Sequence, residues 1–441
     1  MNDITVLILA GGDSTRFWPL KNKVFTKFLG KPVLYYRLKQ LERYKFSDIV
    51  IVGSKETEFL FTRFRHQYPE FSYKYINQSD SHGMAGAVLS AKEYIQGKKI
   101  LIVKPVDIIE DILFEQLKDY LQKGNYIDGL LTGIHVNSYY PGGYLMVDED
   151  NVNHIFEKPG KDNMPADLVR IVFDYFQSSD LFLEYLDSSK SQKDDLYEIA
   201  LENMISEHKK IKFMDYKGYW GYLNYPWHVL SVMNSFFQNL KPSRGRNLKI
   251  HTNVTINEPV IIEDGVTILE NVKIIGPCYI GRNTMIGNNS IIRESSLGEN
   301  CVIGFSTEIT RSHIGDNCWF HSNYIGDSIL DEDVGVGGHA TFANFRLDEQ
   351  SVKSKVGRQL IDTNQTKLGA IIGPHVRIGV GALIMPGVKV GADSFIGAAV
   401  TLTEDLPDNK AVFIKQTHTI KQNREKITRS SRESLRRAMK I

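Results

Sequence analysis

The sequence predicts an open α/β sheet followed by a parallel β-helix, and two repeating patterns support this division. In the second half of the chain, aliphatic residues recur every six positions in two runs: Ile256, Ile262, Ile268, Ile274, Ile280, Ile286 and Ile292, then Ile372, Ile378, Ile384, Val390 and Ile396. A period of six fits neither an α-helix nor a two-sided strand, but it is typical of a coil with three flat faces. The first half alternates short apolar runs with amphipathic segments, which indicates strands and helices in an open sheet covered on both faces.

These patterns divide the chain into four expected segments. Residues 1–240 form the α/β domain, with strands at 4–9, 49–52 and 100–103 and helices at 32–44 and 84–95. Residues 241–250, which include Pro242 and Gly245, are expected to be a linker. Residues 251–406 form the coil, interrupted by an insert at 346–366. Residues 407–441 form a basic tail, which we expect to be a solvated end rather than a binding helix.

Composition limits the partners and the compartment. The net charge is +1, so the chain as a whole has no attraction for nucleic acid. The cysteines Cys278, Cys301 and Cys318 have no Cys-x-x-Cys spacing, which indicates free thiols in a reducing compartment. No apolar stretch reaches membrane-spanning length, and the run at 4–10 is too short for a signal peptide. We therefore expect a cytoplasmic protein with no membrane partner.

A glycine-rich turn after the first strand predicts a phosphate site. Gly11 and Gly12 leave backbone N–H groups free to face an anion. Arg16 adds a fork of donors for phosphate oxygens, and Lys27 adds a second positive charge. Taken alone, such a turn is more often structural.

The surrounding stretch is more specific. The segment from Leu9 to Leu20, with Lys27 and with Lys31 before Pro32, resembles the signature of sugar-1-phosphate nucleotidylyltransferases. Further resemblances follow in the family's order across residues 3–235: Gln78, Gly83 to Ala87, Asp107, 141–144, 157–159 and 220–230. The resemblance implies a Rossmann-like nucleotidyltransferase sheet. It also implies attack by a sugar-1-phosphate on a nucleoside triphosphate (NTP), with release of pyrophosphate, as in nucleotide-sugar biosynthesis.

The resemblance also implies a role for each matching residue. The NTP phosphates and base would be held by Arg16 and Lys27, by the amides of Gly11, Gly12, Asp13, Ser14 and Thr15, and by Gln78 and Gly83. Asp107 would hold Mg²⁺, Gly143 and Glu157 would bind sugar hydroxyls, and Lys158 would bind the sugar phosphate. Two simpler interpretations remain: Asp107 could cap the following helix, and Glu157 could pair with Lys158 on the surface.

Three positions depart from the family pattern. Ser14 stands where the family has a second glycine, and Thr26 replaces the proline before the lysine. Tyr222 stands where the family has an aspartate as second metal ligand, and a phenol does not replace a carboxylate on Mg²⁺. Asn224, two residues further on, offers an amide oxygen, so we expect Asp107 and Asn224 as the metal ligands.

The coil resembles left-handed β-helix acyltransferases, and most closely the archaeal form of the bifunctional N-acetylglucosamine-1-phosphate uridylyltransferase/acetyltransferase family. The matching stretches are 321–327, 336–346 and 367–373, with departures at Gly335 and His339. The resemblance implies that His321 removes the amine proton, a task suited to histidine near neutral pH. Tyr324 and Lys367 would hold the sugar phosphate and Asn344 a sugar group. It also implies acetyl-CoA along the last coils, near 397–399, and a homotrimer. The simpler alternative is that His321 only fills a solvated corner.

Three functions remain open from the sequence. The first is a bifunctional nucleotidylyltransferase and sugar N-acetyltransferase, and the second is a nucleotidylyltransferase with a purely structural coil. The third is a catalytically impaired regulatory or binding subunit, for which Tyr222 is the indicator. Gln78 favours UTP or dTTP, whereas the Phe17 to Leu20 stretch keeps GTP open. The sugar is not determined.

Overall fold

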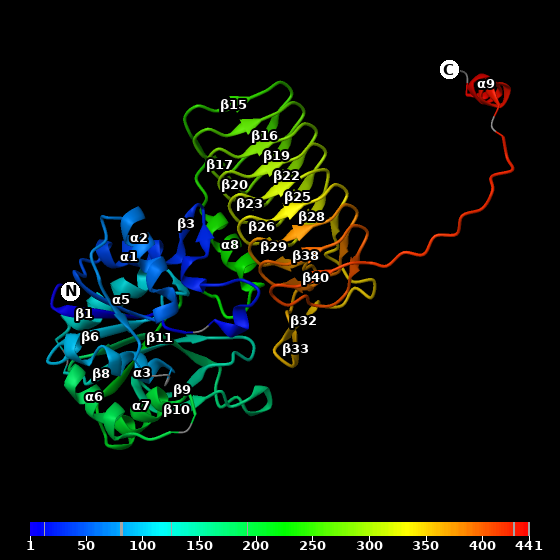
Figure 1. Cartoon of the computed structure of the whole chain (residues 1–441). Helices are drawn as coiled ribbons and strands as arrows, with labels where there is room; N and C mark the ends of the chain where they lie inside the picture. Colours follow the sequence, from blue (N-terminus) through cyan, green and yellow to red (C-terminus); the bar gives the residue numbers. More distant parts are fainter. Residues whose placement is uncertain (13, 80–82, 125, 192, 427, 440–441) are drawn as a thin grey trace.

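The computed structural model describes the chain except residues 13, 80–82, 125, 192, 427 and 440–441. It contains an α/β domain, a coil of parallel strands standing beside it, and a C-terminal tail that extends away from both (Figure 1). The expected fold class, an open α/β sheet followed by a left-handed β-helix, is confirmed. No helix in the described part of the chain is long and apolar enough to cross a membrane.

The α/β domain is built on a nine-stranded sheet in the order β5-β4-β1-β6-β11-β8-β12-β10-β9. Strand β1 (Ile4–Leu9) lies between β4 (Asp48–Gly53) and β6 (Lys99–Val103), and both neighbours run parallel to it. All six residues of β1 are buried, which explains its uninterrupted apolar run. The three strands expected from the sequence are therefore confirmed.

The remaining elements of this domain cover the sheet or extend it. The other strands are β2 (Lys27–Phe28), β3 (Lys31–Pro32), β5 (Lys74–Asn77), β7 (Asp107–Ile109), β8 (Gly129–His135), β9 (Gly143–Asp148), β10 (Asn151–Glu157), β11 (Leu168–Phe176), β12 (Ile211–Asp215) and β13 (Trp220–Tyr222). The helices are α1 (Val33–Arg43), α2 (Glu58–Gln67), α3 (Gly83–Ser90), α4 (Lys92–Ile95), α5 (Ile112–Gln122), α6 (Ser179–Ser188), α7 (Leu196–Ser206) and α8 (His228–Gln238), with short 3-10 turns η1 (Thr15–Phe17), η2 (Lys23–Phe25), η3 (Lys55–Thr57) and η4 (Lys161–Asn163). The helix expected at 32–44 corresponds to α1, whereas the one expected at 84–95 is divided at Ala91 into α3 and α4.

The coil has three parallel sheets, one for each face. The first face contains β14 (Ser243–Arg244), β17 (Val260–Ile262), β20 (Cys278–Ile280), β23 (Ser296–Leu297), β26 (His313–Ile314), β29 (Ile329–Leu330), β34 (Ile371–Ile372) and β37 (Lys389–Val390). The second contains β15 (Lys249–Ile250), β18 (Thr267–Ile268), β21 (Met285–Ile286), β24 (Val302–Ile303), β27 (Trp319–Phe320), β30 (Gly335–Val336), β35 (Arg377–Ile378), β38 (Phe395–Ile396) and β40 (Ala411–Val412). The third contains β16 (Thr255–Asn257), β19 (Lys273–Ile275), β22 (Ile291–Arg293), β25 (Glu308–Thr310), β28 (Tyr324–Gly326), β31 (Thr341–Phe342), β36 (Leu383–Ile384) and β39 (Thr401–Leu402).

Three details of the coil bear on the expectations from the sequence. The coil begins earlier than residue 251, because β14 and β15 lie in the segment expected to be a linker and already pair with β17 and β18. The insert at 346–366 contains a hairpin of β32 (Lys353–Val356) and β33 (Gln359–Asp362). The three cysteines are buried and form no disulfide, as expected. In the tail, α9 (Arg429–Ala438) is exposed along its length.

The six-residue period has a direct packing explanation that can be tested. The repeated aliphatic side chains point into the coil and form one core, in which Ile292 is fully buried, whereas its neighbour Ile291 points outward and is 38% exposed. We expect Ile292→Ala to destabilise the coil by about 2–5 kcal/mol, because the cavity it leaves cannot collapse fully. Ile291→Ala is the matched control, with an expected change well under about 1 kcal/mol. Thermal unfolding of both variants gives the comparison, and equal losses would contradict the inward register.

The α/β domain and the coil share an apolar interface on the first face. Phe28 and Trp227 of the α/β domain pack in one cluster with Tyr279, Ile329 and Ile371 of the coil. This cluster is buried to the same degree as the separate cores of the two domains. The relative placement of the domains is therefore stabilised by hydrophobic burial.

Candidate functional site

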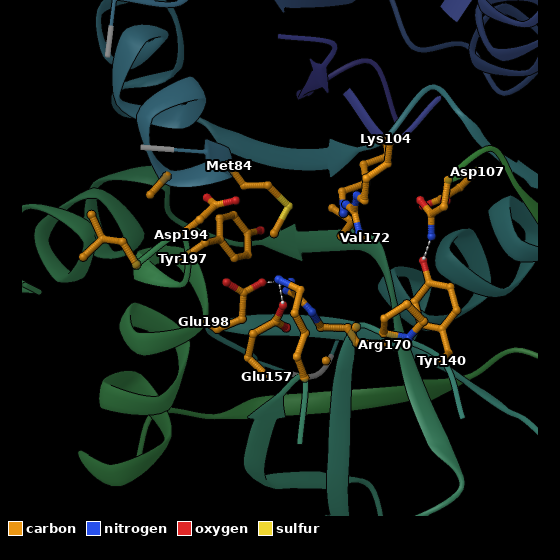
Figure 2. A pocket seen from close by; sticks show the side chains of 18 of the residues that line it. Met84, Lys104, Asp107, Tyr140, Glu157, Arg170, Val172, Asp194, Tyr197 and Glu198 are labelled. Carbon is orange, nitrogen blue, oxygen red and sulfur yellow. Dashed lines mark hydrogen bonds and ion pairs between the residues drawn. The ribbon is translucent and has the colours of Figure 1, made fainter. Parts of the chain in front are cut away.

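A polar pocket of about 140 Å³ opens at the end of the α/β sheet, beside the residues that follow β1 and β6. Its lining brings together the sequence-predicted Arg16, Asp107, Gly143, Glu157, Lys158 and Asn224. In Figure 2, Asp107 and Tyr140 lie at one end, Asp194 and Tyr197 at the other, and Arg170 between them. Carboxyl ends of parallel strands are where open α/β sheets bind their ligands.

The glycine-rich loop after β1 makes a tight turn at Ser14. Ser14 adopts the left-handed backbone conformation (φ 55°), so the serine at the family's glycine position retains a glycine-like turn at a cost of about 1 kcal/mol. A Cβ atom at Gly11 would overlap Oε1 of Gln78, so the loop and the expected base-reading residue lie against each other. Nε2 of Gln78 in turn donates to the carbonyl oxygen of Gly83 (3.1 Å). Thr15 begins η1, and Asp13 lies outside the described residues.

Asp107 lies at the start of β7, directly opposite Tyr222 of β13. The Tyr222 ring packs edge-on against Tyr140 (4.9 Å between centroids) and does not line the pocket, whereas Asn224 does. Nδ2 of Asn224 donates to the Tyr140 hydroxyl (3.0 Å), so its amide oxygen is the atom left to act as a ligand. Nδ1 of His228 accepts from the backbone N–H of Asn224 (3.3 Å) and thereby fixes this turn.

Asp107 is buried, and several positively charged side chains surround it. Asp107 is only 7% exposed, and burial raises the pKa of its carboxyl above the usual range. The charges of Lys104, Arg37 and Lys23 oppose this shift and lower the pKa. A carboxylate held in this way gains strongly from a bound cation, because the cation replaces lost hydration.

The residues at this point fit Mg²⁺. Mg²⁺ is usually held by one or two protein oxygens, while substrate phosphates and water supply the rest. Asp107 and Asn224 offer one carboxylate and one amide oxygen in the lining of the same pocket. In the part of the chain that the structure describes, there is no group of three or more His, Cys, Asp or Glu side chains that would hold a metal alone.

The expected sugar subsite lies on two paired strands. Gly143 of β9 pairs with Glu157 of β10, and a Cβ atom at residue 143 would come within 3.3 Å of Oε2 of Glu157. The glycine therefore leaves open the space that this carboxylate faces. Nζ of Lys158 contacts Oε1 of Glu157 (2.6 Å), as in the simpler interpretation, but both residues also line the pocket.

The charged floor of this pocket was not expected from the sequence. Arg170 and Asp174 belong to β11, all nine residues of which are buried. Arg170 donates to Oδ2 of Asp174 (2.9 Å) and to Oε1 of Glu198 (2.7 Å), and the Tyr197 hydroxyl also donates to Asp174 (2.8 Å). Burial raises the pKa of both carboxyls, while the Arg170 charge lowers it. Charged residues inside an apolar run were the available signal, since buried charges are rarely found unpaired.

Lys27 is not among the described residues that line this pocket. It begins β2, and its Nζ lies 2.5 Å from Oδ2 of Asp316, a corner residue of the coil. The Trp18 indole N–H likewise donates to Oδ1 of Asp408 (2.8 Å). Asp408 belongs to the coil and not, as expected from the sequence, to the tail, because the coil continues to β40, which pairs with β38. We call the segment from Gly11 to Lys27 the phosphate loop. Its second half therefore contacts the coil.

The four residues expected to act in the coil occupy two places at or beside its third face. The Tyr324 hydroxyl and the Asn344 amide nitrogen both face the Cα atom of Gly326, because a Cβ there would lie within 2.8 and 2.6 Å of them. The backbone of Lys367 pairs with that of Phe345, next to Asn344. His321 is exposed at the corner before β28, and a Cβ at Gly338 would lie 3.9 Å from the His321 Cβ. The expected acetyl-CoA segment at 397–399 is largely exposed, and α9 lies apart from it (Figure 1).

Two buried histidines predict a pH dependence of stability. Burial lowers the pKa of His228 and of His313 to about 4, from an ordinary value of 6.5. The unfolded chain therefore binds protons at these sites below about pH 6.5, whereas the folded chain does so only near pH 4. We expect each histidine to remove about 3 kcal/mol of stability as the pH falls across this window, and to have no effect above about pH 7.

The measurement compares the wild type with the variant His228→Gln/His313→Gln across this pH range. Buried carboxyls with raised pKa values, such as Asp331 at about 6, act in the opposite direction, so only the difference between the two proteins reports the histidines. We expect the midpoint of urea unfolding to fall more steeply with acid in the wild type. Parallel curves would show that the two imidazoles do not carry the effect.

Comparisons with known proteins cover both domains. The nucleotidyl transferase model matches residues 5–222, and the bacterial transferase hexapeptide (six repeats) model matches residues 277–311 and 369–404. The chain is 33% identical to a bifunctional sugar-1-phosphate nucleotidylyltransferase/acetyltransferase of Sulfurisphaera tokodaii, over 85% of this chain and 90% of the relative. It is 31% identical to the bifunctional protein GlmU of Methanococcus vannielii, over 94% of this chain and 99% of the relative. Among solved structures, a UDP-glucose pyrophosphorylase complexed with UDP-glucose is 17% identical with a TM-score of 0.46, covering 53% of this chain and 98% of that one.

Proposed function

The chain belongs to the family of bifunctional sugar-1-phosphate nucleotidylyltransferase/acetyltransferases, and from this premise we propose that its α/β domain makes a nucleotide sugar from an NTP and a sugar-1-phosphate. One observation carries the proposal. Phosphate-binding, metal-binding and sugar-binding candidates that are far apart in sequence (Arg16, Asp107 and Glu157) line a single pocket.

The proposed reaction is an in-line displacement at the α-phosphorus. A phosphate oxygen of the sugar-1-phosphate forms a bond to this phosphorus, and the bond to the pyrophosphate leaving group breaks. Arg16 and the loop amides bind the triphosphate, and Lys158 binds the sugar phosphate. Gly143 provides the space and Glu157 the acceptor for a sugar hydroxyl. Positioning and charge neutralisation of this kind provide most of the rate in phosphoryl-group chemistry.

Mg²⁺ would be held by Asp107 and Asn224, and when bound it would neutralise charge on the phosphates. Tyr140 supports this arrangement by accepting a hydrogen bond from the Asn224 amide, which leaves the amide oxygen for the metal. Gln78 and Gly83 are proposed to read the base, with UTP or dTTP preferred.

The experiment is a pyrophosphate-release assay with Mg²⁺. UTP, dTTP, GTP, CTP and ATP are each combined with glucose-, N-acetylglucosamine-, galactosamine- and mannose-1-phosphate. We expect turnover with at least one pyrimidine nucleotide and loss of it when EDTA is added. Binding of an NTP without turnover for any pair would instead support the regulatory subunit indicated by Tyr222.

A second activity is proposed for the coil, namely transfer of an acetyl group from acetyl-CoA to the amine of a sugar-1-phosphate. It is favoured by the exposed His321 and by the convergence of Tyr324 and Asn344 near Gly326. The sugar amine would attack the thioester carbonyl, CoA would leave as the thiol, and His321 would accept the amine proton. Lys367 would bind the sugar phosphate. A homotrimer assembled through the coil is proposed with this activity, and sedimentation of the full chain tests it.

A further inference from the structure

The phosphate loop is held at two places, one in the nucleotide pocket and one on the coil. Arg16 lines the pocket, whereas Trp18, only two residues later, donates to Asp408 of the coil. Lys27 contacts Asp316, which follows β26, and both residues line the groove between the two domains. The loop that binds phosphate in the proposed reaction therefore depends on the coil for the placement of its second half.

The coil carboxylates that receive the loop are oriented by the coil itself. Oδ1 of Asp316 accepts the backbone N–H of Glu299 from the preceding coil (2.9 Å), which leaves Oδ2 directed at Lys27. Oδ1 of Asp408 likewise accepts the N–H of Ala392 (2.9 Å) in addition to the Trp18 indole. The Asp316 side chain is only 16% exposed, so its carboxylate is less solvated than that of a typical surface ion pair. A fixed, partly desolvated carboxylate of this kind holds a lysine better than two mobile surface chains do.

We propose that Lys27 joins the loop to Asp316 and makes this coil residue a positioning residue for nucleotidyl transfer. The inference rests on the proposed nucleotidyl transfer and adds no bond-making step to it. It assigns to the coil a role in the reaction of the other domain.

A double-mutant cycle tests the link to the coil. We expect Lys27→Ala and Asp316→Ala each to raise the KM for the NTP about five-fold with kcat nearly unchanged, as for the loss of a partly exposed ion pair. The variant carrying both changes should be no worse than either single variant, because the two residues act through one contact. Lys27→Arg, which keeps the charge, should restore most of the wild-type KM. Lys99→Ala, which removes an exposed ion pair with Asp3 (2.6 Å), is the matched control with no expected change.

A loss of about 100-fold in Lys27→Ala together with a normal Asp316→Ala would show that Lys27 itself contacts the phosphates, and would overturn the proposal.

The outcome for the wild type separates this inference from the proposed function. If the wild type turns over and the double-mutant cycle is additive, only this inference fails. If the wild type binds an NTP without turnover, the same cycle is measured on NTP affinity by calorimetry, with the same pattern expected. A wild type that neither binds nor turns over any NTP contradicts both.

Discussion

Replacing Asp107 by alanine is expected to lower Mg²⁺-dependent nucleotidyl transfer by about three orders of magnitude. Among the described residues that line the pocket, Asp107 supplies the carboxylate at the end where Tyr140 and its partner Asn224 lie (Figure 2). Its loss removes the charged metal ligand and leaves an amide oxygen alone. The measurement is kcat for pyrophosphate release at saturating Mg²⁺, with the best substrate pair of the wild type.

The control for this variant is Asp111→Ala, further along the same segment. Asp111 precedes α5 and pairs with the exposed Arg43, away from the pocket, so we expect a normal rate. A near-normal rate for Asp107→Ala would remove this residue from the site and leave its carboxyl as a buried structural group.

The raised pKa of Asp107 adds a pH signature. Burial favours the protonated form, so protons compete with Mg²⁺ for this carboxyl at a higher pH than for an exposed aspartate. Lowering the pH therefore weakens the metal-dependent rate, and adding Mg²⁺ should shift the acid limb of the kcat/KM profile to lower pH. An acid limb that does not respond to the Mg²⁺ concentration would assign it to another group.

The coil was predictable in detail because its period and its packing have the same cause. Each inward position needs an aliphatic side chain, so the spacing from Ile256 to Ile292 is enough to reveal the register. The start of the coil was predicted less well, since the first strands at 243–250 have exposed side chains and lack the pattern. A strand whose side chains are exposed needs no apolar residues at regular spacing, so the periodic pattern that marks the coil is missing there.

The site was predictable where recognisable motifs mark its residues, and not where distant residues meet without a motif. The order of motifs brought Arg16, Asp107 and Glu157 to one pocket, as expected for loops at one sheet edge. The pairing of Lys27 with Asp316 joins residues 289 positions apart, so no local pattern could indicate it. The substitution at Tyr222 was visible in the sequence, but the packing of this ring against Tyr140 was not.

The second large effect is expected for His321→Ala, which should lower acetyl transfer by about 100- to 1,000-fold if His321 removes the amine proton. His321 is exposed at the corner of the coil that directly precedes β28, the strand that carries Tyr324. The measurement is release of the CoA thiol, detected with DTNB, from acetyl-CoA and glucosamine-1-phosphate.

His339→Ala is the matched control for this variant. The backbone N–H of His339 donates to the carbonyl oxygen of Ser322 (2.8 Å), which places His339 on the exposed corner one coil further along. The two histidines have the same chemistry and both are exposed, so a loss confined to His321→Ala reports its position near Tyr324. If the His321→Ala variant transfers acetyl groups as fast as the wild type, His321 has no catalytic role. The coil then acts only on the reaction of the α/β domain, through contacts such as that of Lys27 with Asp316.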